Sequence, residues 1–246
     1  MVTMNNNTSI SERAVLVTGG AHRIGRTIAL SLAENGWNIA LHYHTSQQEA
    51  ESTAQEIYGK GVLCELFHCD LSCESDVSEL IPAVVRVFPG LSLLVNNASL
   101  FEKKSIAETD NETLDRIWSV NLKAPVILMR DFARICSRGQ IITIIDALYK
   151  HGDYHYAAYF LTKNGLAYAT QLAAKEFGPG IRVNAVAPGI ILPPDEDSPA
   201  FMERNSRLTP LKRKGTPEDI AQAVRFLIEH TFITGHILYV DGGEHL

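Results

Sequence analysis

Short apolar runs alternate with longer amphipathic stretches along almost the whole chain, from residue 14 to residue 240. Most of the runs are continuously apolar, which is typical of parallel strands buried on both faces. Seven runs are predicted to be strands: Ala14–Thr18, Trp37–Tyr43, Val62–Cys69, Leu91–Asn96, Gln140–Asp146, Arg182–Ala187 and Ile237–Val240. Six stretches between them have helical periodicity: Ile24–Glu34, Gln47–Tyr58, Glu74–Val87, Glu112–Ile135, Tyr156–Phe177 and Pro217–Glu229. This succession predicts an α/β fold of the Rossmann type, with a doubly wound, seven-stranded parallel sheet flanked by helices on both faces.

The length of 246 residues suits one large α/β domain. No linker interrupts the alternation, so we expect residues 13–246 to form a single domain after a disordered, Asn-rich tail of residues 1–12. Residues 188–215 stand outside the pattern and contain five prolines. Because a loop this long in a compact fold is usually functional, we expect it to form a lid over the substrate site.

The formal net charge of −6 argues against nucleic acid or an anionic membrane as a partner. It does not exclude a small positive patch for one phosphorylated ligand. The four cysteines form no C-x-x-C pair and no zinc-like spacing, so no metal site is expected. The N-terminus lacks the pattern of a signal peptide, and no run reaches the roughly 18 apolar residues that span a bilayer. We therefore expect a cytoplasmic protein.

A glycine-rich segment from Thr18 to Gly25 follows the first predicted strand and opens the first predicted helix. Glycines permit a tight turn, and the N-terminus of a helix offers unpaired N–H groups and a positive dipole end to a pyrophosphate. Such a segment between a strand and a helix predicts a dinucleotide-binding site. The alternative is an ordinary turn.

The second predicted strand runs into His44-Thr45-Ser46, a segment without an acid. A carboxylate there would bind the ribose 2′-hydroxyl of NAD. These three side chains can instead donate to a 2′-phosphate, so NADPH/NADP+ is the expected cofactor. The nearby His42 is expected to be an ordinary strand residue. Asp70, which closes the third strand, either accepts from the adenine amino group or caps the helix that follows.

Tyr159 and Lys163 are spaced i, i+4, which places them on one face of a predicted helix. A phenol has an ordinary pKa near 10, so it exchanges protons poorly at neutral pH unless a fixed cation lowers that pKa. Lys163 would supply this cation, and an oxidised nicotinamide ring would add to it. Taken alone, the pair could also be an ordinary surface pair.

The combination of sequence motifs along the chain resembles that of the short-chain dehydrogenase/reductase family. Five motifs stand in that family's order: the glycine turn, Asn96-Asn97-Ala98, Asn121 in a long helix, Tyr159 with Lys163, and Pro188-Gly189. The resemblance runs from Ala14 to Gly243. It implies that Asn121 and Lys163 sustain a proton relay to Tyr159 and that Lys163 holds the nicotinamide ribose. It also implies a homotetramer assembled through the two long helices.

The same resemblance, together with the turn and the strand-end segments, gives a set of predicted cofactor-binding residues. They are Gly19, Arg23, Ile24, Gly25, His44, Thr45, Ser46, Asp70, Leu71, Asn97, Ala98, Tyr159, Lys163, Pro188 and Gly189.

Three departures from the family's commonest pattern narrow the class of substrate that the site is expected to bind. Arg23 replaces the middle glycine of the turn, and Asp146 stands thirteen residues before Tyr159, where a serine is usual. Ser99 and Phe101 follow the fourth strand. All three departures are similar to the pteridine reductase branch. The resemblance implies a pterin stacked between nicotinamide and Phe101, with Ser99 and Arg23 near the pterin and the cofactor phosphates. Thr45 stands where that branch has an arginine.

The chemistry of a pterin agrees with these residues. Its reducible bonds are C=N, so a proton must reach a ring nitrogen. Asp146, partly buried beside Tyr159, would have a raised pKa and share in proton delivery. The predicted catalytic residues are therefore Asp146, Tyr159, Lys163 and Asn121. The predicted substrate-binding residues are Arg23, Ser99, Phe101, Asp146 and Tyr159, and Tyr156 is a candidate for the pocket wall only.

Each assignment has a plainer alternative. Asp146 could cap the following loop, Phe101 could be a core aromatic, and Arg23 could pair with a surface carboxylate. At the level of function, the main hypothesis is NADPH-dependent reduction of dihydropterins or dihydrofolate-like substrates. The alternatives are a carbonyl reductase for 3-oxoacyl or other ketones, which Asp146 argues against, and a non-catalytic NADP(H)-binding sensor.

Overall fold

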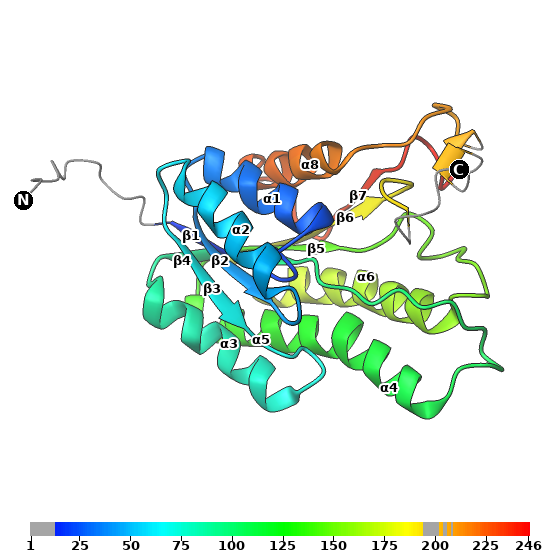
Figure 1. Ribbon diagram of the computed structural model, residues 1–246, viewed down its shortest axis with the longest axis horizontal. Helices are drawn as coiled ribbons and strands as arrows, with labels where there is room; N and C mark the ends of the chain where they lie inside the picture. Colours follow the sequence, from blue (N-terminus) through cyan, green and yellow to red (C-terminus); the bar gives the residue numbers. More distant parts are fainter. Residues whose placement is uncertain (1–12, 194–201, 204–205, 208) are drawn as a thin grey trace, which may run out of the picture.

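Seven strands form one sheet in the order β3-β2-β1-β4-β5-β6-β7, and every pairing in it is parallel (Figure 1). The computed structural model describes residues 13–193, 202–203, 206–207 and 209–246. The strands are β1 (Ala14–Val17), β2 (Asn38–Tyr43), β3 (Cys64–His68), β4 (Leu91–Asn96), β5 (Gly139–Ile144), β6 (Ile181–Pro188) and β7 (Ile237–Val240). The predicted Rossmann-type fold is confirmed. The predicted disordered tail, residues 1–12, lies outside the described residues, as do residues 194–201, 204–205 and 208 of the predicted lid.

The order of the strands brings the predicted motifs together. From β1 the chain builds outward through β2 to β3, and then it returns to place β4 on the other side of β1. The loops after β1 and β4 therefore diverge and leave a crevice at the carboxyl edge of the sheet, where ligands bind in doubly wound folds. The glycine turn follows β1 and Asn97 follows β4, so both motifs border this crevice.

Helices cover both faces of the sheet. One face carries α1 (Arg23–Glu34), α2 (Gln47–Tyr58) and α8 (Pro217–Glu229), and the other carries α3 (Glu74–Val87), α4 (Asn111–Trp118), α5 (Ala124–Cys136) and α6 (Ala157–Phe177) (Figure 1). Two apolar cores result. Val15 and Val17 of β1 belong to the first, whereas Ala14 and Leu16 belong to the second. Burial on both faces explains why this strand is continuously apolar.

The long helix expected over Glu112–Ile135 is interrupted, so this expectation is wrong in one respect. Between α4 and α5 lies one π-helical segment, Ser119–Lys123, and Asn121 sits at its centre. Pro125 at the start of α5 accounts for the change. It lacks an N–H group, and in a regular helix its ring would clash with the carbonyl of the residue four positions earlier, which is Asn121.

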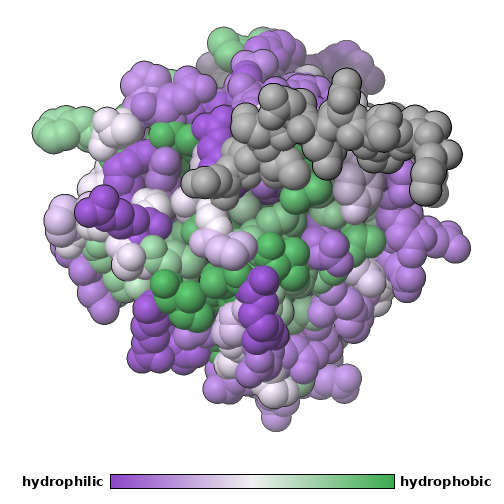
Figure 2. Space-filling view, turned by 90° about the vertical axis from the view of Figure 1, so that its left-hand side faces the viewer, coloured by the Kyte–Doolittle hydropathy of each residue, from purple (hydrophilic) through white to green (hydrophobic). Residues whose placement is uncertain are grey.

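The amino ends of the strands lie to the left in Figure 1, and the carboxyl edge with its motifs lies to the right. Figure 2 shows the left-hand face, where apolar residues gather near the middle and hydrophilic residues surround them. In the part of the chain that the structure describes, no helix combines the length and the apolar character needed to cross a bilayer.

Phe132→Ala should lower the free energy of unfolding by about 3–5 kcal/mol, because Phe132 is fully buried in α5 and its loss leaves a cavity. Denaturant unfolding followed by circular dichroism measures the change. The matched control is Arg134→Ala, on the exposed side of the same helix, with an expected change within about 0.5 kcal/mol. Equal losses in the two variants would contradict the place of Phe132 in the core.

Candidate functional site

The glycine turn forms a backbone cradle that leaves no space for a side chain at Gly25. A Cβ there would lie 2.1 Å from the Gly19 carbonyl oxygen and 2.5 Å from Asn97 Nδ2. Asn97 Nδ2 donates to the carbonyls of Thr18 at 2.9 Å and Gly19 at 3.1 Å, which ties the loop after β4 to the turn. Gly19 itself has φ +61°. The first turn of α1 carries no acid, so its N-terminus can face a phosphate group.

Arg23 adopts φ +54°, the left-handed conformation that favours glycine. This explains why a glycine is usual at this position of the turn. The Arg23 guanidinium donates from Nη2 to the Pro193 carbonyl at 2.7 Å. It therefore links the turn after β1 to the segment after β6. Among the residues that the structure describes, Arg23 forms no ion pair with a carboxylate.

His42 has a larger role than that of an ordinary strand residue. Its Nδ1 accepts from the Gly19 N–H at 3.0 Å, and its Nε2 lies 3.0 Å from the Cys69 carbonyl oxygen. Burial lowers the pKa of His42 to about 4, so the ring is neutral at pH 7. A neutral imidazole that accepts at Nδ1 carries its proton on Nε2 and donates it to Cys69. His42 thus ties the glycine turn to the end of β3.

The predicted 2′-phosphate segment is open to solvent. His44 and Thr45 are exposed, and Ser46 precedes α2 without using its hydroxyl as a helix cap. Asp70 does not cap α3, because its Oδ1 accepts from the N–H and the hydroxyl of Ser72, both at 2.8 Å. Its Oδ2 lies 3.9 Å from His44 Nε2. His68, which sequence reasoning passed over, stands 5.8 Å from the His44 ring and adds a second imidazole.

Asp146, Tyr159 and Lys163 meet beyond the carboxyl end of β5. Tyr159 Oη donates to Asp146 Oδ2 at 2.8 Å. Asp146 Oδ1 accepts from the Leu148 N–H at 2.8 Å, so Asp146 also caps the following loop. Lys163 Nζ donates to the Ile144 carbonyl at 3.0 Å and lies 5.5 Å from the centre of the Tyr159 ring. Three of the four predicted catalytic residues, Asp146, Tyr159 and Lys163, therefore form one contiguous group.

Burial sets the electrostatics of this group. It raises the pKa of Tyr159 well above its ordinary value, and the Asp146 carboxylate raises that pKa further. Burial also raises the pKa of Asp146, and it lowers the pKa of Lys163 to about 8. The expected lowering of the Tyr159 pKa by Lys163 is wrong here, because the phenol is desolvated and hydrogen-bonded to a carboxylate. The phenol keeps its proton at neutral pH, which is the form that can donate.

Asn121 fixes the loop after β4. Its Oδ1 accepts from the Leu100 N–H at 2.7 Å, and its Nδ2 donates to the Leu100 carbonyl at 2.8 Å. Leu100 stands between Ser99 and Phe101, so this amide holds the backbone that carries both predicted substrate residues. Its part in a proton relay stays a prediction.

Phe101 is 42% exposed, which rules out the alternative of a core aromatic. Its ring stacks on Tyr156 with centroids 4.2 Å apart and meets the Tyr159 ring edge-on at 4.6 Å. The Ala157 N–H donates to the Lys104 carbonyl at 3.2 Å, which joins the loop of Phe101 to the start of α6. An aromatic surface therefore borders the phenol, and Tyr156 belongs to it.

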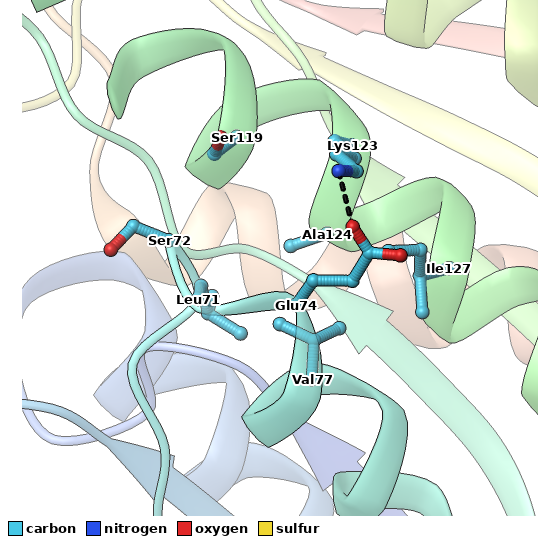
Figure 3. Close-up of a pocket in the computed structure, with 8 residues that line it drawn as sticks. All are labelled: Leu71, Ser72, Glu74, Val77, Ser119, Lys123, Ala124 and Ile127. Carbon is cyan, nitrogen blue, oxygen red and sulfur yellow. Dashed lines mark hydrogen bonds and ion pairs between the residues drawn. The ribbon is translucent and has the colours of Figure 1, made fainter. Parts of the chain in front are cut away.

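The small pocket in Figure 3 lies between the start of α3 and the π-helical segment. Leu71 is the one predicted site residue among those that line it. Lys123 and Glu74 form an ion pair across it. Across the described residues, this pocket included, no group of three or more His, Cys, Asp or Glu side chains is placed to hold a metal ion.

A second carboxyl group, which sequence reasoning missed, lies near Asp146. Glu244 follows β7, and its Oε2 would be 2.6 Å from a Cβ at Gly189, directly after β6. Burial and the charge of Asp146 raise the pKa of Glu244 to about 7. The sequence contained one signal for this residue, an acidic side chain just beyond the last predicted strand. Only the pairing of β7 with β6 in the folded sheet brings Glu244 to the end of β6.

Gly25→Ala should weaken NADPH binding by about tenfold or more, because the added methyl group must displace the Gly19 peptide and the Asn97 amide. Fluorescence titration with NADPH measures the dissociation constant. Gly61→Ala is the control for a general loss of stability: its positive φ of +81° strains an alanine, but no atom lies near the added methyl group. Unchanged binding in Gly25→Ala would contradict the assignment of the cradle.

Comparisons with known proteins agree with this geometry. A family model described as enoyl-(acyl carrier protein) reductase matches residues 19–245. The 3-oxoacyl-[acyl-carrier-protein] reductase FabG of Staphylococcus epidermidis is 34% identical over 242 residues, which cover 95% of this chain and 99% of that protein. The solved structure of FolM alternative dihydrofolate reductase 1 from Brucella suis, in complex with NADP, has a TM-score of 0.90 and 36% identity and covers 96% of each chain.

A solved short chain dehydrogenase from Burkholderia cenocepacia, in complex with NADP, has a TM-score of 0.89 and 28% identity and covers 97% of this chain and all of its own. The matches thus extend over the glycine turn, the Tyr159 group and the carboxyl edge of the sheet. The chain belongs to the short-chain dehydrogenase/reductase family of oxidoreductases.

Proposed function

We propose that the chain is an NADPH-dependent reductase that converts dihydropterins, or dihydrofolate-like substrates, to their tetrahydro forms. The observation that carries this proposal is the hydrogen bond from Tyr159 Oη to Asp146 Oδ2 at 2.8 Å. A carboxyl group whose pKa is raised by burial can hold a proton for a ring nitrogen, which a serine hydroxyl does less well. The name of the similar Brucella suis structure, an alternative dihydrofolate reductase, supports the same substrate class.

NADP(H) is the cofactor in this proposal, and the residues fit it. Gly19 and Gly25 keep the turn free of side chains, and the start of α1 offers N–H groups to the phosphates. His44 and Thr45 stand exposed at the end of β2 to meet a 2′-phosphate. Two similar solved structures are complexes with NADP. When bound, the reduced cofactor supplies the hydride.

Three side chains would handle the proton. Tyr159 donates its hydroxyl proton to the ring nitrogen next to the carbon that is reduced. Asp146 accepts the hydrogen bond of that hydroxyl. In its protonated form, which burial favours, it returns a proton to the phenolate and then takes one from solvent. Lys163, buried with a pKa of about 8, keeps a positive charge near the phenol and is the residue expected to hold the nicotinamide ribose.

The aromatic surface of Phe101 would receive the flat substrate. A heteroaromatic ring gains about 0.5–1.5 kcal/mol from an offset stack beyond the contribution of burial. The edge-on contact of Phe101 with Tyr159, at 4.6 Å, puts this surface next to the proton donor. Ser99 is exposed on the same loop, and Arg23 reaches toward Pro193 across the crevice, so both can line the substrate site.

Reduction of 3-oxoacyl or other ketone substrates is the second candidate. It is favoured by the identity of 34% to the Staphylococcus epidermidis 3-oxoacyl reductase. Against it stands Asp146, which replaces the serine that would bind a substrate carbonyl. The non-catalytic alternative is disfavoured by the assembled group of Asp146, Tyr159 and Lys163.

A homotetramer is part of the proposal, together with a location in the cytoplasm. Leu161, Tyr168 and Leu172 of α6 are 53%, 62% and 46% exposed. Their spacing of seven and four residues places them in one stripe along the helix. Because an apolar stripe of this kind is usually covered by a partner, we expect a second copy of the chain to cover it.

A matched panel tests the substrate. Purified protein with NADPH should reduce a dihydropterin or dihydrofolate with a kcat/KM at least about tenfold higher than that for a 3-oxoacyl thioester, because only the former uses the Asp146 acid. Oxidation of NADPH, followed at its absorbance band, gives the rates. Faster reduction of the thioester, or no turnover of any pterin, would overturn the proposal.

In the same panel, Asp146→Ser should lower kcat/KM for the dihydropterin by about tenfold or more while the dissociation constant of NADPH stays within about twofold. Asp115→Ser, at an exposed position of α4, is the control and should change neither quantity. Equal losses of turnover and of NADPH affinity would refute a role for Asp146 in proton delivery.

Light scattering should give the mass of four chains at micromolar concentration. Tyr168→Glu should yield smaller particles, because a buried charge without a partner destabilises an interface. Gln55→Glu, exposed on α2, adds a charge away from the stripe and should leave the mass unchanged. A monomeric wild-type chain would reject the assembly.

A further inference from the structure

Two exposed imidazoles lie side by side at the ends of neighbouring strands. His68 is the last residue of β3, and it pairs in register with Tyr43, the last residue of β2. The Tyr43 and His68 rings meet edge-on, with their centroids 5.5 Å apart. His44 follows Tyr43, and the centroid of its ring lies 5.8 Å from that of His68. The pairing of β2 with β3 thus gathers two imidazoles, His44 and His68, at the carboxyl edge of the sheet.

This imidazole pair lies on the face of the sheet that carries α1 and α2. Side chains alternate along a strand, so His68 lies on the same face as Leu66. Leu66 and Tyr43 pack against the core that α1 and α2 cover, whereas Phe67 packs against the core on the other face. The glycine turn opens α1 on this same face. In doubly wound folds the end of the second strand recognises the adenosine ribose of a dinucleotide, so the pair borders that position.

The segments that end β2 and β3 contain no permanent cation. Neither residues 42–50 nor residues 66–73 include a Lys or an Arg. On α1, Arg23 donates to a backbone carbonyl after β6, and Arg26 forms an ion pair with a carboxylate of α2. His42 is buried, and burial lowers its pKa to about 4, so its ring is neutral. Along these two segments, positive charge for a phosphate can therefore come only from the imidazole pair.

A carboxylate lies beside one member of the pair. Asp70 Oδ2 is 3.9 Å from His44 Nε2. The Ser72 N–H holds the pKa of Asp70 below its ordinary value, and the charges of His44 and His68 lower that pKa further. Asp70 is therefore ionised and competes with a phosphate for His44. Within the residues that the structure describes, His68 forms no ion pair with a carboxylate, so its imidazole is available to a phosphate.

Two further elements bring titratable groups toward this edge. From α2, Glu49 and Glu51 line an open hollow that begins at Thr45. From α1, His22 is exposed at the N-terminus of the helix. An ordinary carboxyl group keeps its charge above about pH 6, so these acids weaken phosphate binding evenly over the range in which imidazoles titrate. His22 is a third imidazole, and its contribution is measured separately below.

We propose that His68 joins His44 in binding the 2′-phosphate of NADP(H), so that the protonation of two imidazoles, in place of a permanent cation, sets the preference over NAD(H). The sequence pattern indicates His44, whereas only the pairing of β3 with β2 brings His68 beside it. A protonated imidazole carries a charge and donates from both nitrogens, whereas a neutral one donates from a single nitrogen. The pair therefore binds the phosphate more tightly in slightly acidic than in alkaline solution.

This inference concerns the cofactor and not the substrate. It assigns His68 a part in the choice between two cofactors that differ by a single phosphate group. It therefore holds whether the enzyme reduces a pterin or a ketone, and binding measurements without any substrate can test it.

Fluorescence titrations of the full-length protein with NADPH and with NADH test the pH dependence. The ratio of the NADH to the NADPH dissociation constant should fall by about tenfold between about pH 6.5 and about pH 8.5, because the imidazoles lose their protons. The 2′-phosphate, with a second pKa of about 6, stays ionised over this range. NADH lacks this phosphate, so its dissociation constant should change by less than about twofold. A ratio that is independent of pH would overturn the inference.

Variants assign the pH dependence to residues. At about pH 6.5, His68→Gln should raise the NADPH dissociation constant by about three- to tenfold and that of NADH by less than about twofold, since an amide donates but takes no charge. In the double variant His44→Gln/His68→Gln, the ratio should be nearly independent of pH. Adding Thr45→Arg to the double variant supplies a permanent cation and should restore NADPH affinity at both pH values. His230→Gln, exposed after α8, is the control and should keep the wild-type behaviour.

Equal losses of NADPH and NADH affinity in His68→Gln would overturn the inference, because they would indicate a structural role. A pH dependence that persists in the double variant and disappears in His22→Gln would also overturn it, because the charge would then come from the start of α1. If no pterin is reduced, the proposed function fails, and the titrations still decide whether His68 takes part in the choice of cofactor.

Discussion

The hydrogen bond between the Tyr159 hydroxyl and the Asp146 carboxyl group is the interaction on which the account of this site depends. Both groups are desolvated, and burial raises the pKa of each. A serine hydroxyl beside the phenol would be a neutral partner that does not readily give up a proton. A buried carboxyl group beside the phenol can, in its protonated form, replace the proton that the phenol donates. In the proposed function, this difference suits the reductase scaffold to substrates whose reduced bond ends at nitrogen.

The scaffold holds this interaction through ties between loops at the carboxyl edge of the sheet. His42 joins the glycine turn to the end of β3, and Asn97 joins that turn to the loop after β4. Asn121 fixes the same loop further along, at Leu100. Because backbone groups accept or donate most of these bonds, the loops are positioned largely independently of the side chains that they expose. Ser99 and Phe101 can therefore set the substrate while the cradle stays the same.

The fold and much of the site were predictable from local patterns. Continuous apolarity identifies strands, and the i, i+4 spacing places Tyr159 and Lys163 on one helix face wherever that helix packs. Features that depend on two distant segments were not predictable. The π-helical turn at Asn121 arises because Pro125 would clash with its carbonyl in a regular helix. The pKa of Tyr159 is raised because the phenol is buried in the folded chain. Glu244 lies over Gly189 because β7 pairs with β6 in the sheet.

A crystal structure of the protein with NADP and a dihydropterin tests the central claim most directly. The account predicts the pteridine ring against Phe101, with a ring nitrogen within about 3 Å of Tyr159 Oη and the Tyr159–Asp146 hydrogen bond intact. A ligand bound away from Phe101, or a phenol turned away from Asp146 in the complex, would contradict it.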